Sequence, residues 1–338
     1  MTKSNLPTEF ELVARYFASL TAGFPGAYGL LDDAAVISPS AGHELVVKTD
    51  AVVGDVDFFP DTRADLIARK SLRVNLSDLA AKGAVPRAYL IDLIVPDTIT
   101  EEWIAAFAGG LADDQIEYSI HLIGGDTSST SGPITVAVTA FGEVPIGRII
   151  RRGGAQPDDL IYVTGTIGDA ALGLSVLRGE LPTLDVAAAT YLVDRCRLPQ
   201  PRVILGPQLV GIASAGIDIS DGLVADLKHI CTVSNLCATI EATAVPLAPA
   251  AAAAIDGNSQ RLAMALTGGD DYDLLFTAHP DETDRINALS RSSGIAITSI
   301  GRMSAQSQHE EPAVIVRNKL GEPLHFACEG WTHFGEQG

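Results

Sequence analysis

Apolar runs of strand length alternate with helical stretches along this chain, and many of these runs end in a short turn that carries aspartate. The turns are rich in Gly, Ser and Thr, and they read LLDDAAVI (30–37), VVKTDAVVGD (46–55), VNLSDLAAKGA (74–84), HLIGGDTSST (121–130), GIDISDGLVADL (216–227) and LTGGDDYDLLF (266–276). Strands that alternate with helices are typical of α/β and α+β folds. A carboxylate beside flexible backbone suits Mg²⁺ and the phosphates that Mg²⁺ carries. The pattern therefore predicts an α/β (α+β) fold that gathers several Mg²⁺ ions for phosphoryl transfer.

The chain has 338 residues, which is long for one hydrophobic core, so we expect two domains. The composition changes at VPIGRIIRRGGAQPDD (144–159), a segment rich in Pro, Gly and Arg between two β-type runs. Such a segment is typical of an interdomain connection. We therefore predict one domain over residues 1–145 and a second over residues 150–338.

Periodic apolar residues and β-branched runs predict the individual elements. A capping box of Thr8 and Glu11 begins an N-terminal helix whose apolar stripe extends to Leu20. Further helices are expected over 63–82, 100–116, 187–195, 202–213, 248–255, 258–266 and 281–292. Strands are expected at 34–37, 44–49, 87–95, 119–123, 134–143, 272–277, 296–301 and 313–317.

The charge of the chain limits its partners. The chain has 42 acidic and 23 basic residues. The resulting net charge of −19 repels nucleic acid and anionic membranes. The same charge would repel a nucleotide unless cations neutralise the carboxylates first. The four cysteines form no CxxC pair, no signal peptide is evident, and no apolar stretch reaches membrane-spanning length. We therefore expect a cytoplasmic protein with neither nucleic acid nor membrane as a partner.

Taken singly, each aspartate turn also has an ordinary structural explanation. Asp33 can belong to a plain turn, Thr49–Asp50 can cap a helix, and Asp78 can lie on a helix surface. The Gly-Gly-Asp turns and the Ser-Asp turn can be capped turns as well. The chain contains no GxxxxGK[ST] and no GxGxxG after its first strand, which excludes a P-loop and a dinucleotide-binding fingerprint.

The motifs VNLSDLAAKGA, LIGGDT, GRIIRRGGAQPDDLIYVTGTIGDAALGL, IDISDGL and GGDDYDLLF, in this order, resemble those of thiamine-monophosphate kinases. These belong to a superfamily with aminoimidazole ribonucleotide and selenophosphate synthetases, and the resemblance runs from residue 10 to residue 334. It implies direct transfer of the γ-phosphoryl group of ATP to thiamine monophosphate, giving thiamine diphosphate. It also implies an N-terminal ATP- and metal-binding domain whose mixed sheet pairs across a homodimer into a β-barrel. A C-terminal α/β sandwich would complete the active site.

The resemblance also assigns roles to individual residues. Several Mg²⁺ ions would be held by a set drawn from both halves of the chain, namely Asp33, Lys48, Thr49, Asp50, Asp78, Asp126, Asp218 and Asp221. The catalytic centre would comprise Asp126, Asp218 and Asp221. ATP would meet Gly125, Asp126, Arg152 and Ser220, and the thiamine phosphate would meet Asp57, Asp270 and Trp331. Phosphoryl transfer requires positioning and charge neutralisation, so we expect no phosphoenzyme.

Four places depart from the pattern that the resemblance implies. Leu31 replaces a glycine, and Lys48 replaces a small hydroxyl residue. Asp57 replaces a residue that is commonly His, and Asp270–Asp271 replaces a Glu-Asp pair. These changes leave open a related ATP-using enzyme that acts on another phosphate-bearing small molecule. A nucleotide- or metal-binding regulator without catalysis is the other alternative, although retention of every aspartate motif argues against it.

Overall fold

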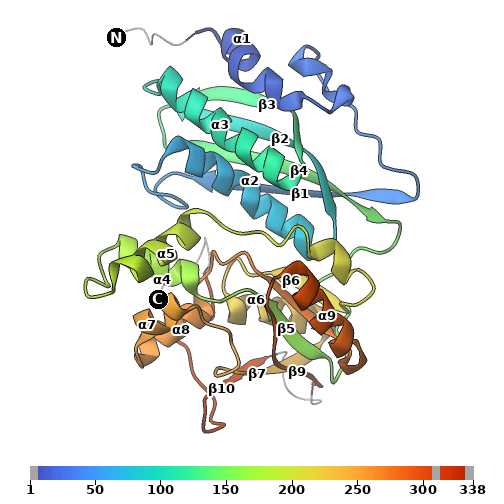
Figure 1. Cartoon of the computed structure of the whole chain (residues 1–338), viewed down its shortest axis with the longest axis vertical. Coiled ribbons are helices and arrows are strands. Elements are labelled where there is room, and N and C mark those ends of the chain that lie inside the picture. The colour runs from blue at the N-terminus through green and yellow to red at the C-terminus, as the bar shows by residue number, and fades with distance from the viewer. Residues whose placement is uncertain (1–6, 307–312, 332–338) are drawn as a thin grey trace. The chain divides into compact units, whose positions relative to one another are not determined.

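The computed structural model describes residues 7–306 and 313–331, which form two compact units (Figure 1). The first unit extends to Leu79 and includes Ala84–Gly147, and the second comprises Ala80–Gly83 and the chain from Arg148 onward. The chain therefore changes unit at residues 147–148, inside the segment predicted as the connection. Among the described residues, no helix has the length and apolar character needed to cross a membrane.

The first unit is a mixed four-stranded sheet covered by two long helices. Its strands are β1 (His43–Val53), β2 (Val85–Pro96), β3 (His121–Thr130) and β4 (Thr135–Pro145), in the order β1-β4-β2-β3. β4 pairs antiparallel with β1 and β2, whereas β2 and β3 run parallel. The helices α2 (Ala64–Ala81) and α3 (Glu101–Tyr118) lie side by side across one face of the sheet (Figure 1).

Helix α2 is held on the sheet by apolar packing and beside α3 by one buried ion pair. Its residues Leu72, Leu76 and Leu79 are fully buried. Arg73 Nε donates to Asp114 Oδ2 of α3 at 2.8 Å, and both side chains are buried. Breaking such a pair leaves an uncompensated charge, so it fixes how the two helices pack. The sheet and α2 thus form a rigid support for side chains that lie between them.

The N-terminal segment differs from its prediction. The capping box of Thr8 and Glu11 is confirmed, but α1 covers only Glu9–Leu12, and a π-helical turn (Val13–Phe17) and 3₁₀ turns (Ala18–Thr21, Pro25–Leu30) follow. Phe17 and Leu20 are buried whereas Phe10 is exposed, so the apolar residues do not share one continuous buried face. The predicted strand at 34–37 is wrong, because this segment packs against Ala27 and Ala88 as an irregular loop.

The second unit is built around a six-stranded sheet in the order β10-β7-β9-β5-β8-β6. The strands are β5 (Leu160–Thr164), β6 (Ala215–Asp218), β7 (Leu236–Glu241), β8 (Leu274–Ala278), β9 (Ile297–Ala305) and β10 (Val314–Arg317). Only β10 and β7 pair in parallel. The helices are α4 (Asp169–Leu177), α5 (Val186–Arg197), α6 (Leu223–Ser234), α7 (Pro249–Ile255), α8 (Ser259–Thr267) and α9 (Thr283–Ser293), with short 3₁₀ turns at Gly206–Leu209 and Pro280–Glu282. The α/β class predicted from the sequence is confirmed.

Helix α6 packs its apolar side onto this sheet. Leu223, Leu227 and Ile230 are buried in one cluster with Ile217 of β6 and Leu275 of β8. The α6 N-terminus therefore lies directly after the end of β6, and the connecting turn is fixed by packing on both sides.

The helix predicted over 202–213 is wrong. Only the 3₁₀ turn Gly206–Leu209 forms there. Pro207 cannot donate a helical hydrogen bond, and a Cβ on Gly206 would overlap the backbone of Ala80.

Candidate active site

In the first unit, β1 and α2 bring three of the predicted residues together. Lys48 and Asp50 are two positions apart on β1, so their side chains leave the same face of the sheet. Asp78 of α2 meets them there. Lys48 Nζ lies 3.1 Å from Asp50 Oδ2 and 3.0 Å from Asp78 Oδ2. The lysine ammonium therefore stands between the two carboxylates.

The charges of this group perturb one another. Burial alone would lower the pKa of Lys48, but the carboxylates of Asp78 and Asp50 outweigh burial and raise it. Burial also raises the pKa of Asp50; Lys48 opposes this rise and Asp78 adds to it. A protonated amine has no free electron pair, so the side chain of Lys48 acts here as a cation and offers no ligand atom to a metal.

Thr49, predicted to contribute to the same group, points to the other face of the sheet. Its hydroxyl donates to the carbonyl oxygen of Val138 at 3.1 Å and accepts from the hydroxyl of Thr139 at 3.1 Å. Val47 and Ala51 share this exposed face with Thr49. The alternation of side chains along β1 therefore separates Thr49 from Asp50 and Asp78.

Asp33 and Asp126 are exposed carboxylates of the first unit, with no basic partner among the residues that the structure describes. Asp33 lies in a loop where its own N–H donates to Asp32 Oδ1 at 2.8 Å, so Asp32 serves the turn, as expected. Asp126 lies on the edge strand β3 and accepts from the hydroxyl of Ser128 at 3.0 Å. Both carboxylates face solvent, where a cation can reach them.

Gly125 precedes Asp126 at a place where β3 approaches β2 closely. Its φ is 153°, and a Cβ there would overlap the carbonyl oxygen of Ile91. Any other residue would be strained at this position. At this position, therefore, no side chain covers the backbone beside Asp126.

Asp57, predicted to contact the substrate, has a local structural role. Its Oδ2 accepts from the N–H of Val53 at 2.7 Å, and Lys70 Nζ donates to its carbonyl oxygen at 2.9 Å. These bonds close the turn that follows β1. One carboxylate oxygen is therefore engaged with the protein.

In the second unit, the turn between β6 and α6 presents Asp218, Ser220 and Asp221. Asp218 is the last residue of β6 and is 3% exposed, whereas Ser220 and Asp221 are half-buried. The turn is tied down by Asp226, one helical turn into α6. Asp226 Oδ2 accepts from the N–H groups of Ser220, Asp221 and Gly222 at 3.0, 3.0 and 3.1 Å.

Asp226 was not singled out from the sequence, although it stands in the quoted motif GIDISDGLVADL. Burial raises the pKa of Asp226 to about 8, and the nearby carboxylates of Asp218 and Asp221 add to the rise. Ligand atoms of Asp221, Asp226 and the exposed His229 lie within 4.8 Å of one another, close enough to hold a metal ion. The turn therefore brings several carboxyl groups and one imidazole close together.

The loop that carries Asp270 and the segment that carries Trp331 both dock on this turn. The Asp270 N–H donates to the carbonyl oxygen of Ser220 at 2.8 Å, and the Trp331 N–H donates to that of Asp221 at 3.0 Å. Asp270 has a φ of 71°, and the hydroxyl of Tyr272 donates to its Oδ1 at 3.2 Å. The structure thus places both predicted substrate residues against the turn that carries the predicted metal and ATP residues.

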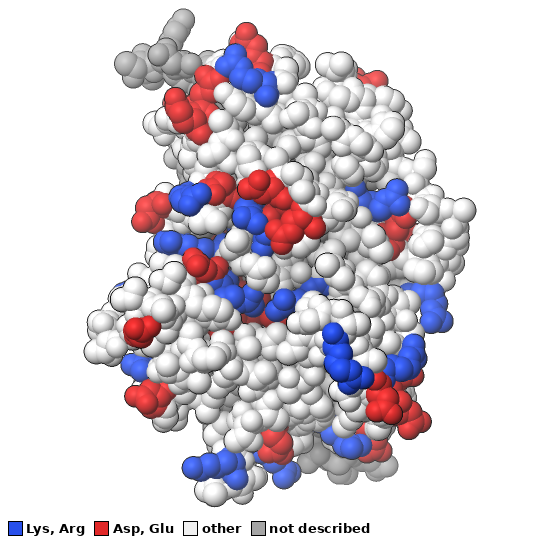
Figure 2. Space-filling view, in the orientation of Figure 1, with Lys and Arg blue, Asp and Glu red and all other residues white. Residues whose placement is uncertain are grey.

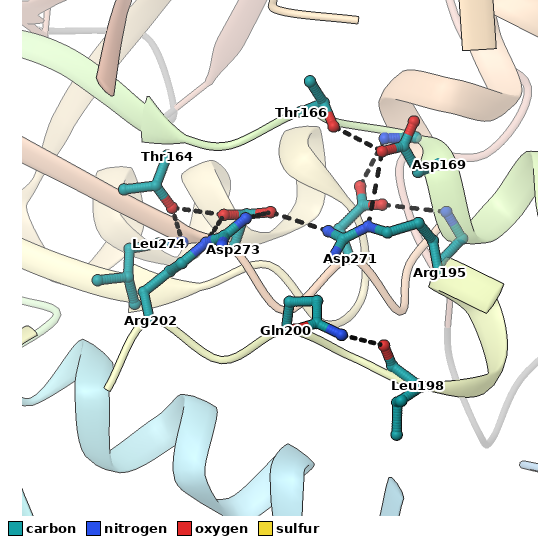
Figure 3. Close-up of polar contacts among 12 residues, drawn as sticks. Thr164, Thr166, Asp169, Arg195, Leu198, Gln200, Arg202, Asp271, Asp273 and Leu274 are labelled. Atoms are coloured by element: carbon teal, nitrogen blue, oxygen red, sulfur yellow. Dashed lines mark hydrogen bonds and ion pairs between the residues drawn. The ribbon is translucent and has the colours of Figure 1, made fainter. Parts of the chain in front are cut away.

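A buried network behind this loop holds it in place (Figure 3). Asp271, which we expected to cap a turn, accepts from the N–H groups of Gly168 and Ala170, at 2.6 and 3.3 Å, where α4 begins. Burial raises the pKa of Asp271 well above its usual range, against the effect of these two donors. The loop is therefore anchored to α4 immediately after Asp270.

Asp273 provides the second anchor (Figure 3). It is fully buried and accepts from Thr164 Oγ1 at 2.6 Å, from Arg202 Nε at 2.6 Å and from Arg195 Nη2 at 3.2 Å. Periodicity could not reveal these partners, because they come from three different parts of the second unit.

Arg152, predicted to contact ATP, is an exposed residue of the second unit for which the described chain offers no protein partner. Acidic and basic side chains are interspersed over the face drawn in Figure 2, so the net charge of −19 is not concentrated in one patch there. The predicted site residues therefore form two sets, one in each unit. One contains Asp33, Lys48, Asp50, Asp78, Gly125 and Asp126, and the other contains Arg152, Asp218, Ser220, Asp221, Asp270 and Trp331.

The fold and this carboxylate-rich site define a class. Residues 31–144 match the N-terminal domain of AIR synthase related proteins, and residues 156–311 match the C-terminal domain of the same proteins. Within this class, the thiamine-monophosphate kinase of Escherichia coli (strain K12) is 38% identical over 327 residues, 96% of this chain and 98% of the relative. The chain belongs to the thiamine-monophosphate kinase family.

Two solved structures support the same assignment. A thiamine-monophosphate kinase from Stenotrophomonas maltophilia K279a superposes with a TM-score of 0.81 at 39% identity, over 91% of this chain and 96% of that one. AaThiL complexed with AMPPCP and TMP gives a TM-score of 0.76 at 27% identity, over 91% of this chain and 97% of that one.

Proposed function

We propose that this chain transfers the γ-phosphoryl group of ATP to the phosphate of thiamine monophosphate, giving thiamine diphosphate and ADP. The observation that carries the proposal is the convergence at the β6–α6 turn. Asp270 and Trp331, expected to contact the thiamine phosphate, each donate a backbone hydrogen bond to the residues expected to meet ATP and metal. Family membership and the complex of AaThiL with AMPPCP, an ATP analogue, and TMP support the same reaction.

The donor set suits several Mg²⁺ ions. Mg²⁺ prefers carboxylate oxygens and keeps several waters, and the carboxylates of Asp33, Asp126 and Asp221 have no basic partner among the described residues. Burial, together with the carboxylates of Asp218 and Asp221, raises the pKa of Asp226, and a cation at this turn would reduce the repulsion among these carboxylates. Bound Mg²⁺ would neutralise negative charge on the phosphates as it develops during transfer.

The chain's own groups would bind and orient the reactants. Because Gly125 has no side chain, a phosphate can approach the backbone there. The planar guanidinium of Arg152 can donate two parallel hydrogen bonds to a phosphate. Trp331 is 45% exposed and offers an aromatic face to the cationic thiazolium ring. Asp270, with a φ of 71°, is bonded through its N–H to Ser220, next to the residue to which Trp331 is bonded. We propose that these groups align acceptor and donor in line, so that no phosphoenzyme forms.

The homodimer is part of the proposal. On the face of the four-stranded sheet opposite α2, Val47 is 58% exposed beside Thr49 and Ala51. An exposed β-sheet face with an exposed apolar residue on its edge strand β1 supports pairing with a second copy into a β-barrel. Sedimentation velocity at micromolar concentration is expected to give a dimer, and a monomer would contradict this part.

Label transfer tests the reaction. With [γ-³²P]ATP, Mg²⁺ and thiamine monophosphate, the label should appear in thiamine diphosphate and not in free thiamine offered beside it. Asp221→Asn should abolish transfer, whereas Asp113→Asn, on the exposed side of α3, should not. An acid-stable or hydroxylamine-sensitive labelled protein would contradict direct transfer. Labelling of only some other phosphate acceptor would favour the related ATP-using enzyme.

A further inference from the structure

The arrangement of Lys48 bears on how many divalent ions this chain needs. Its ammonium group lies at 3.1 Å from one carboxylate oxygen of Asp50 and 3.0 Å from one of Asp78. Both distances are those of charge-assisted hydrogen bonds, slightly lengthened. The two carboxylates therefore already share a cation, and that cation is covalently part of the chain.

Rigid elements hold the three groups in this arrangement. Lys48 and Asp50 lie on the face of β1 that also carries the buried Val46 and Val52, and β1 is paired with β4 over its whole length. Asp78 lies on α2 between the buried Leu76 and Leu79. Groups mounted on packed strands and helices keep their geometry better than groups on loops. The ammonium is therefore positioned by the fold.

Other predicted metal ligands differ from this pair. Asp33, Asp126 and Asp221 have no lysine or arginine partner among the described residues. A divalent ion placed between Asp50 and Asp78 would have to displace the ammonium or accept a like charge beside it, and like charges at this range repel strongly. Asp50 and Asp78 thus differ from Asp33, Asp126 and Asp221, because the described structure supplies a positive charge between them.

We propose that the Lys48 ammonium takes the place of one divalent ion between Asp50 and Asp78. This inference rests on the proposed magnesium site, and it deepens that proposal. It predicts that removing the charge opens one additional ion site per chain, whereas keeping the charge does not. Lys48→Met removes the ammonium at similar length, and Lys48→Arg keeps a cation at the same position.

Counting bound Mn²⁺ tests the proposal without any turnover. The electron paramagnetic resonance signal of free Mn²⁺ is followed during titration of the full-length, metal-stripped protein, with no nucleotide or thiamine phosphate present. Lys48→Met should bind one more Mn²⁺ per chain than the unsubstituted protein, and Lys48→Arg should bind the same number. Lys319→Met, an exposed residue, is the control for the change in net charge and should also bind the same number.

A second substitution locates the additional ion. Asp78→Asn in the Lys48→Met background should return the count to that of the unsubstituted protein, because one of the two carboxylates is lost. Equal counts for Lys48→Met and the unsubstituted protein, in chains whose circular dichroism shows them folded, would overturn the proposal. If the unsubstituted protein binds no Mn²⁺ but Lys48→Met binds one, the Lys48 proposal stands and the proposed magnesium cluster fails.

Discussion

Gly269 sets the distance between the loop of Asp270 and the turn of Ser220 and Asp221. A Cβ built on Gly269 would overlap the Ser220 carbonyl oxygen and would lie 3.0 Å from the carbonyl carbon of Ser220 and 3.2 Å from that of Asp221. Real Cβ atoms essentially never come within 3.0 Å of a non-bonded atom, and this Cβ would lie 2.0 Å from the Ser220 oxygen, so Gly269→Ala has to part the two segments by about 1 Å or more. The atoms that the added Cβ would meet belong to the backbone, so a change of side-chain rotamer cannot relieve the overlap.

The cost of this parting follows from the bonds that join the segments. The Asp270 N–H donates to Ser220 and the Tyr272 N–H donates to Ile219, each at 2.8 Å. Weakening both is expected to lower the free energy of unfolding by about 1–3 kcal/mol. A displacement of about 1 Å between reacting groups can cost about 10²-fold in rate. We therefore expect kcat for thiamine diphosphate formation to fall by about 10- to 100-fold.

Initial rates at saturating ATP and Mg²⁺, together with urea unfolding, measure both effects. Gly109→Ala is the matched control, because Gly109 is exposed in α3 and an added Cβ meets no atom within 4 Å. That variant should keep its activity and gain up to about 1 kcal/mol of stability. A folded Gly269→Ala variant whose kcat stays within about twofold of that of the unsubstituted protein would contradict this role of Gly269, since a shift of this size costs far more.

Three further predictions concern the anchors of the second unit. Asp226→Ala leaves three N–H groups without their acceptor and should lower the free energy of unfolding, measured in urea, by about 3 kcal/mol or more. Asp226→Asn keeps one oxygen and should lower it by less. Equal losses for the two variants would contradict this role of Asp226. Asp273→Ala removes the carboxylate that Arg195 and Arg202 share and should lower the free energy of unfolding by about 3–5 kcal/mol. A loss below about 1 kcal/mol would contradict a stabilising role for these ion pairs. Because the folded-state pKa of Asp271 is raised, its contribution to stability is complete below the unfolded value of about 4 and is lost as the pH rises through the folded value. Asp271→Asn should therefore flatten the decline in unfolding free energy above pH 4, and an unchanged slope would contradict the assignment.

The elements around the site were largely predictable, because they depend on periodicity and local chemistry. The predicted α2 at 63–82 appears as Ala64–Ala81, and the Val-rich run at 44–49 lies inside β1. Prediction failed at 34–37 and at 202–213. At 34–37 packing against Ala27 and Ala88 outweighs the apolar pattern, and at 202–213 the missing N–H of Pro207 interrupts the helix.

The residues of the site were partly predictable from motifs, but their partners were not. Asp270 and Trp331 lie about sixty residues apart in the sequence, and only the structure shows that both donate to the turn of Ser220 and Asp221. Asp226 had a readable signal, a carboxylate on the apolar side of a helix one turn after Ser-Asp-Gly. Lys48 could be recognised as unusual, but its position between two carboxylates depends on how α2 packs over β1.

Product formation from thiamine monophosphate tests the central claim most directly. The purified chain is incubated with ATP, Mg²⁺ and thiamine monophosphate, and thiamine diphosphate and ADP are quantified by chromatography, with free thiamine in a parallel reaction. We expect equal amounts of thiamine diphosphate and ADP, with no product from free thiamine. Absence of thiamine diphosphate, with ATP consumed on another phosphate-bearing acceptor, would contradict it.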